Sequence, residues 1–117
     1  MKIISPNLHG IIDYLVVLFL LASPNIFGFA GLLAIFTYVL GAVHLVLTIL
    51  TNSDSGLFKI IPFPLHGQIE FVVGIVLIVL AFTLFNDNNA GKLFYTAFGA
   101  AVLLVWLITD YKGSKSA

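Results

Sequence analysis

The stretches PNLHGIIDYLVV (Pro6–Val17) and FPLHGQIEFVVG (Phe63–Gly74) follow one pattern, and this pattern decides how the chain is interpreted. Both read Leu-His-Gly-x-Ile-acid-aromatic-x-Val, so a histidine and a carboxylate lie four residues apart in otherwise apolar sequence. Each stretch also has a proline at or near its start, which suits the first turn of a helix because the N–H that proline lacks has no partner there. The recurrence predicts two related helices, each with a polar pair near its beginning.

The amino-acid composition predicts that these helices lie in a membrane. The chain has 117 residues, of which 61% are hydrophobic and 9% are charged, whereas soluble domains carry about 25% charged residues. A surface with so few charges predicts an integral membrane protein whose partner is the lipid bilayer. The formal net charge is zero, so no nucleic acid partner is expected, and the absence of cysteine excludes disulfides and thiolate metal sites.

Four segments are long and apolar enough to be membrane spans, since a spanning helix needs about 20 residues. They cover about residues 7–22, 30–50, 65–85 and 93–109. Turn-forming residues separate them at Ser23–Asn25, Thr51–Gly56 and Asn86–Asn89. We therefore expect an all-α fold, a four-helix transmembrane bundle built from two tandem hairpins. The chain forms one domain (residues 1–117), with repeat 1 at about residues 5–53 and repeat 2 at about residues 62–111.

The second helices of the two hairpins support an internal duplication. The sequence GAVHLVLTILTN (residues 41–52) matches GAAVLLVWLITD (residues 99–110), so that Gly41, Leu45 and Thr51 recur as Gly99, Leu103 and Thr109. Each repeat has two spans, so both copies face the same way across the membrane. An approximate two-fold axis along the membrane normal is expected for such parallel repeats.

Lysine placement predicts the orientation. Four lysines fall on one side of a four-span arrangement (Lys2, Lys59, Lys112 and Lys115), and Lys92 falls on the other. Because cytoplasmic loops are enriched in lysine and arginine, both termini are predicted to be cytoplasmic. Four short helices bury little of their surface against one another, so we also expect a homo-oligomer.

The loop after the first span carries a family resemblance. The sequence LLASPNIFGFAG (residues 20–31) resembles the Ser-Pro-Trp repeat of small bacterial membrane proteins through Ser23-Pro24 and Gly28-Phe29. Asp13-Tyr14 matches the acidic-aromatic pair that opens the family's preceding helix, whereas Asn25 stands where the family has tryptophan. The resemblance covers the first hairpin. It implies a location in the bacterial inner membrane and a helical-hairpin fold, and it implies no chemistry.

The polar residues inside the spans are the candidate site. Positions i and i+4 share a helix face, so His9 pairs with Asp13 and His66 pairs with Glu70. His44 lies about two turns before the end of its helix, which matches the depth of Asp13 in the neighbouring helix at about 1.5 Å per residue. We therefore predict that His44 contacts Asp13. The second repeat has Val102 at the equivalent position, so Glu70 is expected to lack this partner.

Four interpretations of these residues remain open. The His–acid pairs could stabilise the helices alone, as in a structural subunit of a membrane assembly. His9, Asp13, His66 and Glu70 could bind a divalent metal such as Zn²⁺, Mn²⁺ or Fe²⁺. Two histidines could ligate a b-type haem. His44, Asp13, His66 and Glu70 could form a site for a proton, a small ion or a lipid headgroup. No catalytic residue is predicted, because Ser23 belongs to the opposite side from the histidines, and a binding or structural protein is expected rather than an enzyme.

Overall fold

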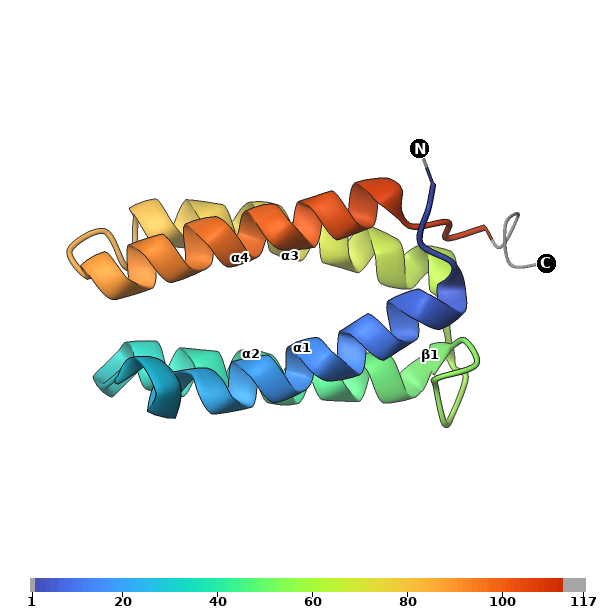
Figure 1. Ribbon diagram of the computed structural model, residues 1–117, viewed down its shortest axis with the longest axis horizontal. Coiled ribbons are helices and arrows are strands. Elements are labelled where there is room, and N and C mark those ends of the chain that lie inside the picture. The colour runs from blue at the N-terminus through green and yellow to red at the C-terminus, as the bar shows by residue number, and fades with distance from the viewer. Residues whose placement is uncertain (1, 113–117) are drawn as a thin grey trace.

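The fold is a bundle of four helices, in a computed structural model that describes residues 2–112 (Figure 1). The helices are α1 (Pro6–Phe27), α2 (Gly31–Leu50), α3 (Phe63–Phe82) and α4 (Asn89–Ile108). All four are long and apolar enough to cross a membrane, which confirms the predicted four-helix transmembrane bundle. Lys115, which contributes to the predicted orientation, lies outside the described residues.

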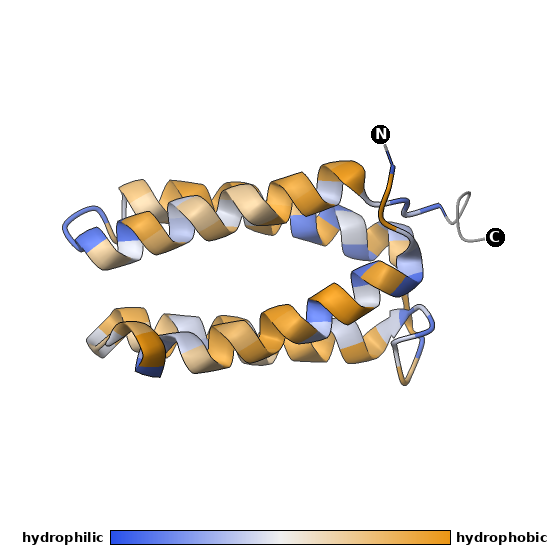
Figure 2. Ribbon diagram, in the orientation of Figure 1, coloured by the Kyte–Doolittle hydropathy of each residue, from blue (hydrophilic) through white to orange (hydrophobic). Residues whose placement is uncertain are grey.

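The two hairpins form two layers. Helix α1 packs against α2 and α3 packs against α4, and the packing within each hairpin is more extensive than the packing between hairpins. The described chain, residues 2–112, begins and ends at the same end of the bundle, where the connection from α2 to α3 also lies, whereas the two helix–helix turns lie at the other end (Figure 1). Apolar residues run along the helices, and hydrophilic residues gather in the α3–α4 turn, in the α2–α3 connection and in the nearby parts of α1 and α3 (Figure 2).

Helix α1 is longer than the sequence predicts, because the Ser23–Asn25 segment is helical and α1 continues to Phe27. Pro24 lacks an N–H, and the Ser23 hydroxyl donates a hydrogen bond of 2.6 Å to the Phe19 carbonyl one turn earlier. The helix ends at Gly28, which adopts a left-handed conformation with φ of 68°. The N–H groups of Gly28 and Phe29 both reach the Pro24 carbonyl, which satisfies the end of the helix.

The second hairpin also differs from the prediction at its turn. Helix α3 ends at Phe82 rather than at about residue 85, and α4 begins at Asn89 rather than at about residue 93. The cause of the earlier start is Asn88, whose side-chain oxygen accepts a hydrogen bond of 3.0 Å from the Gly91 N–H. This cap makes the asparagine-rich segment the beginning of a helix rather than a loop.

Short backbone pairings join the hairpins at the end of the bundle that holds the termini. Strand β1 (Thr51–Asn52), directly after α2, pairs in parallel with β2 (Ile61–Pro62), directly before α3. Ile4, just before α1, pairs in parallel with Thr109, just after α4. The Ile4 N–H donates to the Ile108 carbonyl and the Asp110 N–H donates to the Ile4 carbonyl, both at 2.9 Å. Each pairing therefore places the start of one hairpin beside the end of the other.

The hydrophobic core occupies the opposite half of the bundle. It is a cluster of buried side chains from α2, α3, α4 and the last turn, namely Leu33, Leu77, Ala81, Phe85 and Tyr95. The Tyr95 hydroxyl shares a hydrogen bond of 2.6 Å with Thr37, and the Thr37 hydroxyl also bonds the Leu33 carbonyl of its own helix. The packed core thus joins α2, α3 and α4 in the half of the bundle that lies away from the predicted polar site.

Candidate functional site

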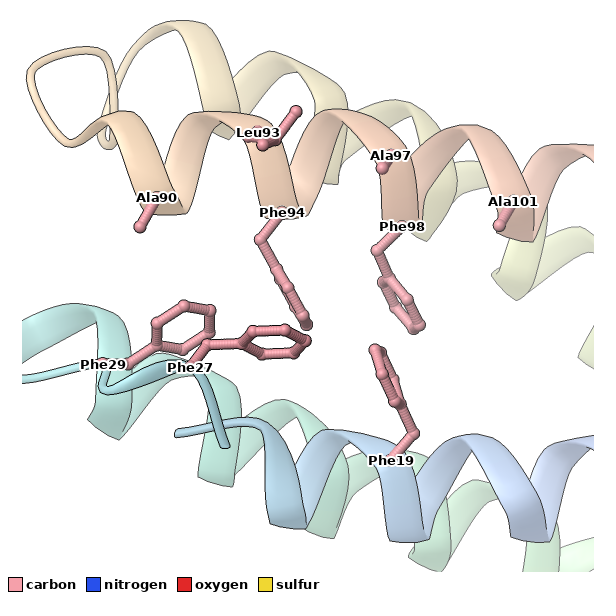
Figure 3. Close-up of a pocket in the computed structure, with 9 residues that line it drawn as sticks. All are labelled: Phe19, Phe27, Phe29, Ala90, Leu93, Phe94, Ala97, Phe98 and Ala101. Carbon is pink, nitrogen blue, oxygen red and sulfur yellow. The ribbon is translucent and has the colours of Figure 1, made fainter. Parts of the chain in front are cut away.

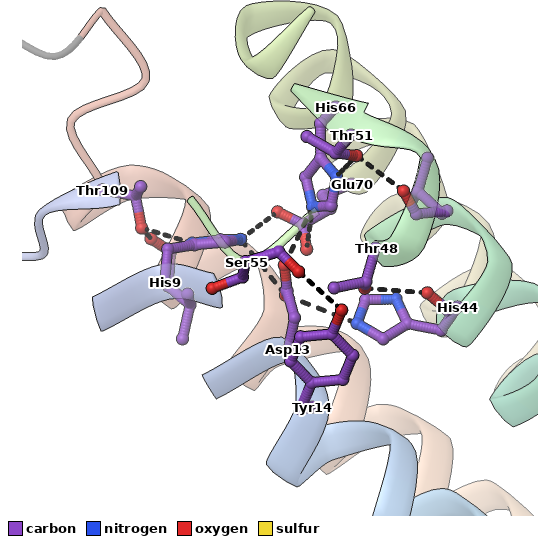
Figure 4. A network of polar contacts seen from close by, with 12 residues as sticks. His9, Asp13, Tyr14, His44, Thr48, Thr51, Ser55, His66, Glu70 and Thr109 are labelled. Carbon is purple, nitrogen blue, oxygen red and sulfur yellow. Dashed lines mark hydrogen bonds and ion pairs between the residues drawn. The ribbon is translucent and has the colours of Figure 1, made fainter. Parts of the chain in front are cut away.

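Two histidines and two carboxylates meet between the hairpins near the end of the bundle that holds the termini (Figure 4). Helix α1 supplies His9 and Asp13, and α3 supplies His66 and Glu70. All four are buried, with both histidines at 0% exposure. One ligand atom from each residue can be chosen so that all four atoms lie within 4.8 Å of one another. We call these four residues the inner cluster.

The contacts within the inner cluster form a closed ring. His9 Nε2 lies 3.2 Å from Asp13 Oδ1 and 2.9 Å from Glu70 Oε1. His66 Nε2 lies 3.2 Å from Asp13 Oδ2 and 3.2 Å from Glu70 Oε2. Each imidazole nitrogen therefore faces one oxygen of both carboxylates, and each carboxylate divides its two oxygens between the two histidines. Neither Nε2 atom has a hydrogen-bond partner of good geometry among the described residues.

The other ring nitrogen of each histidine is held by a threonine from the opposite hairpin. His9 Nδ1 lies 2.9 Å from the Thr109 hydroxyl, and His66 Nδ1 lies 2.7 Å from the Thr51 hydroxyl. The Thr109 hydroxyl donates a hydrogen bond of 2.6 Å to the Val105 carbonyl, and the Thr51 hydroxyl donates one of 2.6 Å to the Leu47 carbonyl. The hydroxyl oxygen is therefore left as an acceptor, so that each Nδ1 carries the proton and donates it.

The two carboxylates also have partners outside the inner cluster. The Tyr111 hydroxyl donates a hydrogen bond of 2.7 Å to Glu70 Oε1. His44 Nε2, on α2, lies 3.4 Å from Asp13 Oδ1 and makes no hydrogen bond of good geometry within the described chain. Burial and the adjacent Glu70 carboxylate raise the pKa of Tyr111, which lies beyond the end of α4. The Tyr111 hydroxyl therefore stays protonated and donates this hydrogen bond at any ordinary pH.

The predicted contact between His44 and Asp13 is confirmed by this geometry. All five residues that the sequence singles out come together, four in the inner cluster and His44 beside it. Val102, the residue that corresponds to His44 in the second repeat, lines a cavity that also touches Asp13, His44 and Glu70. Glu70 has a different outer partner, because Tyr111 reaches it from the C-terminal segment.

Three residues of the site are missing from the sequence-based prediction, namely Thr51, Thr109 and Tyr111. A signal for the threonines exists, because both follow the second helix of their hairpin at matching positions in the aligned repeats. Their role depends on the backbone pairings that bring the end of one hairpin to the start of the other. Nothing in the sequence pattern indicates the role of Tyr111, because it lies in the segment after the last span.

Cavities flank the inner cluster on two sides. Toward the middle of the bundle, a cavity of about 60 Å³ touches Asp13, His44 and Glu70, and one of about 30 Å³ touches His44 and Glu70. Toward the termini, a polar vestibule of about 330 Å³ is lined by Pro6, Asn7, Asn52, Ser53, Asp54, Phe63, Tyr111 and Lys112. The rings of Phe63 and Tyr111 pack against His9, with centroids 5.5 and 5.3 Å away, and separate the vestibule from the inner cluster.

Comparisons of the chain with family models, with curated proteins and with solved structures found no match. The resemblance to the Ser-Pro-Trp repeat therefore stays a prediction, and the function is argued from the geometry of the inner cluster.

Proposed function

We propose that this small integral membrane protein binds a divalent transition-metal ion at the inner cluster, between its two hairpins. The observation that carries the proposal is the state of the two Nε2 atoms. Both are buried, both lack a well-aligned hydrogen bond in the described chain, and both face a pair of carboxylates. A cation between these groups supplies the partner that each atom lacks.

The threonines support this assignment because they fix the histidine tautomer. When Nδ1 of a neutral imidazole donates to a threonine oxygen, the lone pair belongs to Nε2. At both histidines that lone pair is directed toward carboxylate oxygens, which are themselves acceptors. Such an arrangement is repulsive without a cation. Metal-bound histidines typically donate their other ring N–H to an outer partner in this way.

Each of the four inner residues also contacts one side chain outside the inner cluster. Thr109 orients His9, Thr51 orients His66, Tyr111 bonds Glu70, and His44 contacts Asp13. Outer partners orient ligands and raise their affinity for a metal.

The distances between ligand atoms and the charge of the inner cluster also support metal binding. Nitrogen and oxygen ligands bound at about 2.0–2.2 Å to one ion lie about 3 Å apart at right angles and about 3.4 Å apart at tetrahedral angles. The nitrogen–oxygen distances of 2.9–3.2 Å in the ring match this spacing. A divalent ion also neutralises the two carboxylates while both histidines stay neutral, which removes the high cost of net charge in the bilayer.

The principal alternative is a purely structural cluster, which the same short distances favour. If both histidines are protonated, two imidazolium groups and two carboxylates form a neutral network that joins the hairpins. In that network each Nε2–H faces two oxygens at similar distances and cannot align with both of them. A b-type haem is disfavoured, because the described cavities that touch the carboxylates measure about 60 and 30 Å³, far less than a porphyrin requires.

Titration of the detergent-purified, chelator-washed protein with Co²⁺ tests the proposal. One equivalent of Co²⁺ should bind and give visible ligand-field absorption, and His9→Ala or His66→Ala should abolish the absorption. Thr109→Val should weaken Co²⁺ binding by about 10–100-fold, the range found when outer partners of metal ligands are removed. Thr83→Val is the matched control, because Thr83 also bonds its own helix but lies far from the inner cluster.

The structural alternative gives a different result in the same experiment. A wild-type protein that binds no Co²⁺ and contains no metal by elemental analysis would exclude metal binding. Equal Co²⁺ affinity for Thr109→Val and Thr83→Val would exclude the role of the threonine in orienting His9.

A further inference from the structure

Resting on the proposed function, we propose that the bound ion keeps an open coordination position and that a small uncharged molecule, such as a diatomic gas, reaches it from the bilayer. Two features carry this inference. The first is the number of ligand atoms that the protein has free for the ion. The second is a pair of neighbouring cavities, one beside the carboxylates and one open to lipid.

The protein offers the ion four ligand atoms. Tyr111 engages Oε1 of Glu70, and His44 contacts Oδ1 of Asp13. Each carboxylate therefore has one oxygen without an outer contact, Oε2 of Glu70 and Oδ2 of Asp13, and both of these oxygens lie 3.2 Å from His66 Nε2. One oxygen from each carboxylate and one Nε2 from each histidine make up the four ligand atoms. Imidazole and carboxylate ligands suit Fe²⁺ and Mn²⁺, which form sites with further open positions more readily than tetrahedral Zn²⁺ does.

An inner cavity of about 60 Å³ marks where the open position lies. It touches both carboxylates and His44, but neither His9 nor His66 is among its lining residues. The other walls are apolar and include Ile12, Val16, Phe98, Ala101, Val102 and Val105. A space of this size holds a water molecule or a diatomic molecule. Because most of its wall cannot form hydrogen bonds, an uncharged ligand is favoured over an anion.

The inner cavity adjoins a larger apolar groove between the hairpins. This phenylalanine groove has a volume of about 510 Å³ and is lined by Phe19, Phe27, Phe29, Ala90, Leu93, Phe94, Ala97, Phe98 and Ala101 (Figure 3). Phe98 and Ala101 line both spaces, so they form the boundary between the groove and the inner cavity. Exposed Phe27 and Leu93 place the mouth of the groove at the lipid-facing surface.

The two approaches to the inner cluster therefore differ in the molecules that they admit. The vestibule has Asp54, Lys112 and polar side chains in its wall, which suits a hydrated ion. The phenylalanine groove has an almost entirely apolar wall inside the membrane, which suits a molecule that dissolves in hydrocarbon. The metal would enter from the vestibule and the small uncharged ligand from the groove.

Nitric oxide is a suitable probe, because it binds an open position of ferrous iron and gives a high-spin iron–nitrosyl electron paramagnetic resonance signal. The anaerobic, Fe²⁺-loaded full-length protein in lipid nanodiscs should give this signal. Ala101→Phe, which fills the boundary, should keep its iron and form the nitrosyl several-fold more slowly. Ala100→Phe is the matched control, because Ala100 is the neighbour of Ala101 on α4, is exposed like Ala101, and lines neither space. Phe98→Ala should widen the boundary and accelerate formation.

The outcomes separate this inference from the proposed function. Failure of the wild-type protein to bind Fe²⁺ or Co²⁺ would contradict the proposed function itself. Iron that binds without forming a nitrosyl would show a closed coordination sphere and overturn the open position. Equal rates for Ala101→Phe, Ala100→Phe and Phe98→Ala would overturn the route through the phenylalanine groove. If Ala101→Phe does not fold, Phe98→Ala alone still tests the route.

Discussion

At the scale of single residues, the inner cluster depends on groups that surround it. Each ligand candidate is held from outside by one side chain, and three of these partners lie on segments that follow a helix. Tyr111 is the most informative of them, because it lies beyond the last span and its hydroxyl bonds a buried carboxylate. Its ring also packs against Gly67, where a Cβ atom would come within 2.8 Å of it.

Replacement of Tyr111 by phenylalanine isolates the hydrogen bond, since the ring stays. Tyr111→Phe should lower the free energy of unfolding by about 1.5–3 kcal/mol, the usual value for a hydrogen bond to a charged group, and should weaken Co²⁺ binding. Tyr14→Phe is the control, because the Tyr14 hydroxyl donates at the same distance of 2.7 Å but to the Ser55 carbonyl. Thermal unfolding in detergent and Co²⁺ titration measure both effects, and unchanged Co²⁺ affinity in Tyr111→Phe would contradict this role.

The same residue gives a pH dependence with a defined sign. Burial and the Glu70 carboxylate raise the pKa of Tyr111, so the folded state favours the protonated form. The contribution of Tyr111 to stability is therefore complete below about pH 10, where an unfolded tyrosine begins to ionise, and is lost as the pH rises toward the folded pKa. Between about pH 9 and about pH 11, wild type should lose more stability than Tyr111→Phe. An equal loss of stability in the two proteins would contradict the raised pKa of Tyr111.

Much of the site was predictable at this scale, and the limits have physical causes. The spacing of His9 and Asp13, and of His66 and Glu70, places each pair on one face, and depth matching predicted the contact of His44 with Asp13. Periodicity does not give the contacts of Thr51, Thr109 and Tyr111. These contacts depend on where the chain goes after a helix ends, and there the backbone pairings with Ile61 and Ile4 decide the geometry.

At the scale of helices, hydropathy predicted all four spans but misplaced the end of α1. Ser-Pro-Asn is a strong turn signal in water, yet here it lies inside the helix. The Ser23 hydroxyl bonds the Phe19 carbonyl, and the N–H groups of Gly28 and Phe29 bond the Pro24 carbonyl, so the turn around Pro24 stays helical. The helix ends four residues later, at a glycine in a left-handed conformation. The stop signal of α1 is therefore Gly28 rather than Pro24.

Substitutions of Gly28 test this assignment. A Cβ atom at this position would meet no atom within 4 Å, so only the backbone conformation opposes a side chain. Gly28→Val should cost about 1–2 kcal/mol of stability, the penalty for a left-handed residue. Gly28→Asn should cost clearly less, because asparagine tolerates this conformation. Unfolding in detergent compares the two variants, and equal losses would mean that Gly28 is not the stop signal.

At the scale of the whole molecule, the inner cluster lies near one membrane face, and the orientation decides which compartment it meets. The first and last described residues and the connection from α2 to α3 lie at that end of the bundle (Figure 1). Lysine placement predicts that this end is cytoplasmic. Reporter fusions after Lys115 and within Thr51–Gly56 should therefore report the cytoplasm, and a fusion at Asn88 should report the opposite side. The inverse pattern would make the vestibule an opening to the exterior.

The exchange of partners between hairpins has a consequence for how the molecule holds together. Each hairpin contributes one histidine, one carboxylate and the threonine that orients the histidine of the other hairpin. Neither half therefore contains a complete coordination shell, and docking of the halves is thermodynamically linked to occupancy. An ion present at about 100 times its dissociation constant would add about 2.7 kcal/mol to the closed arrangement. The ion would then hold the two hairpins together, and its removal would leave them free to separate.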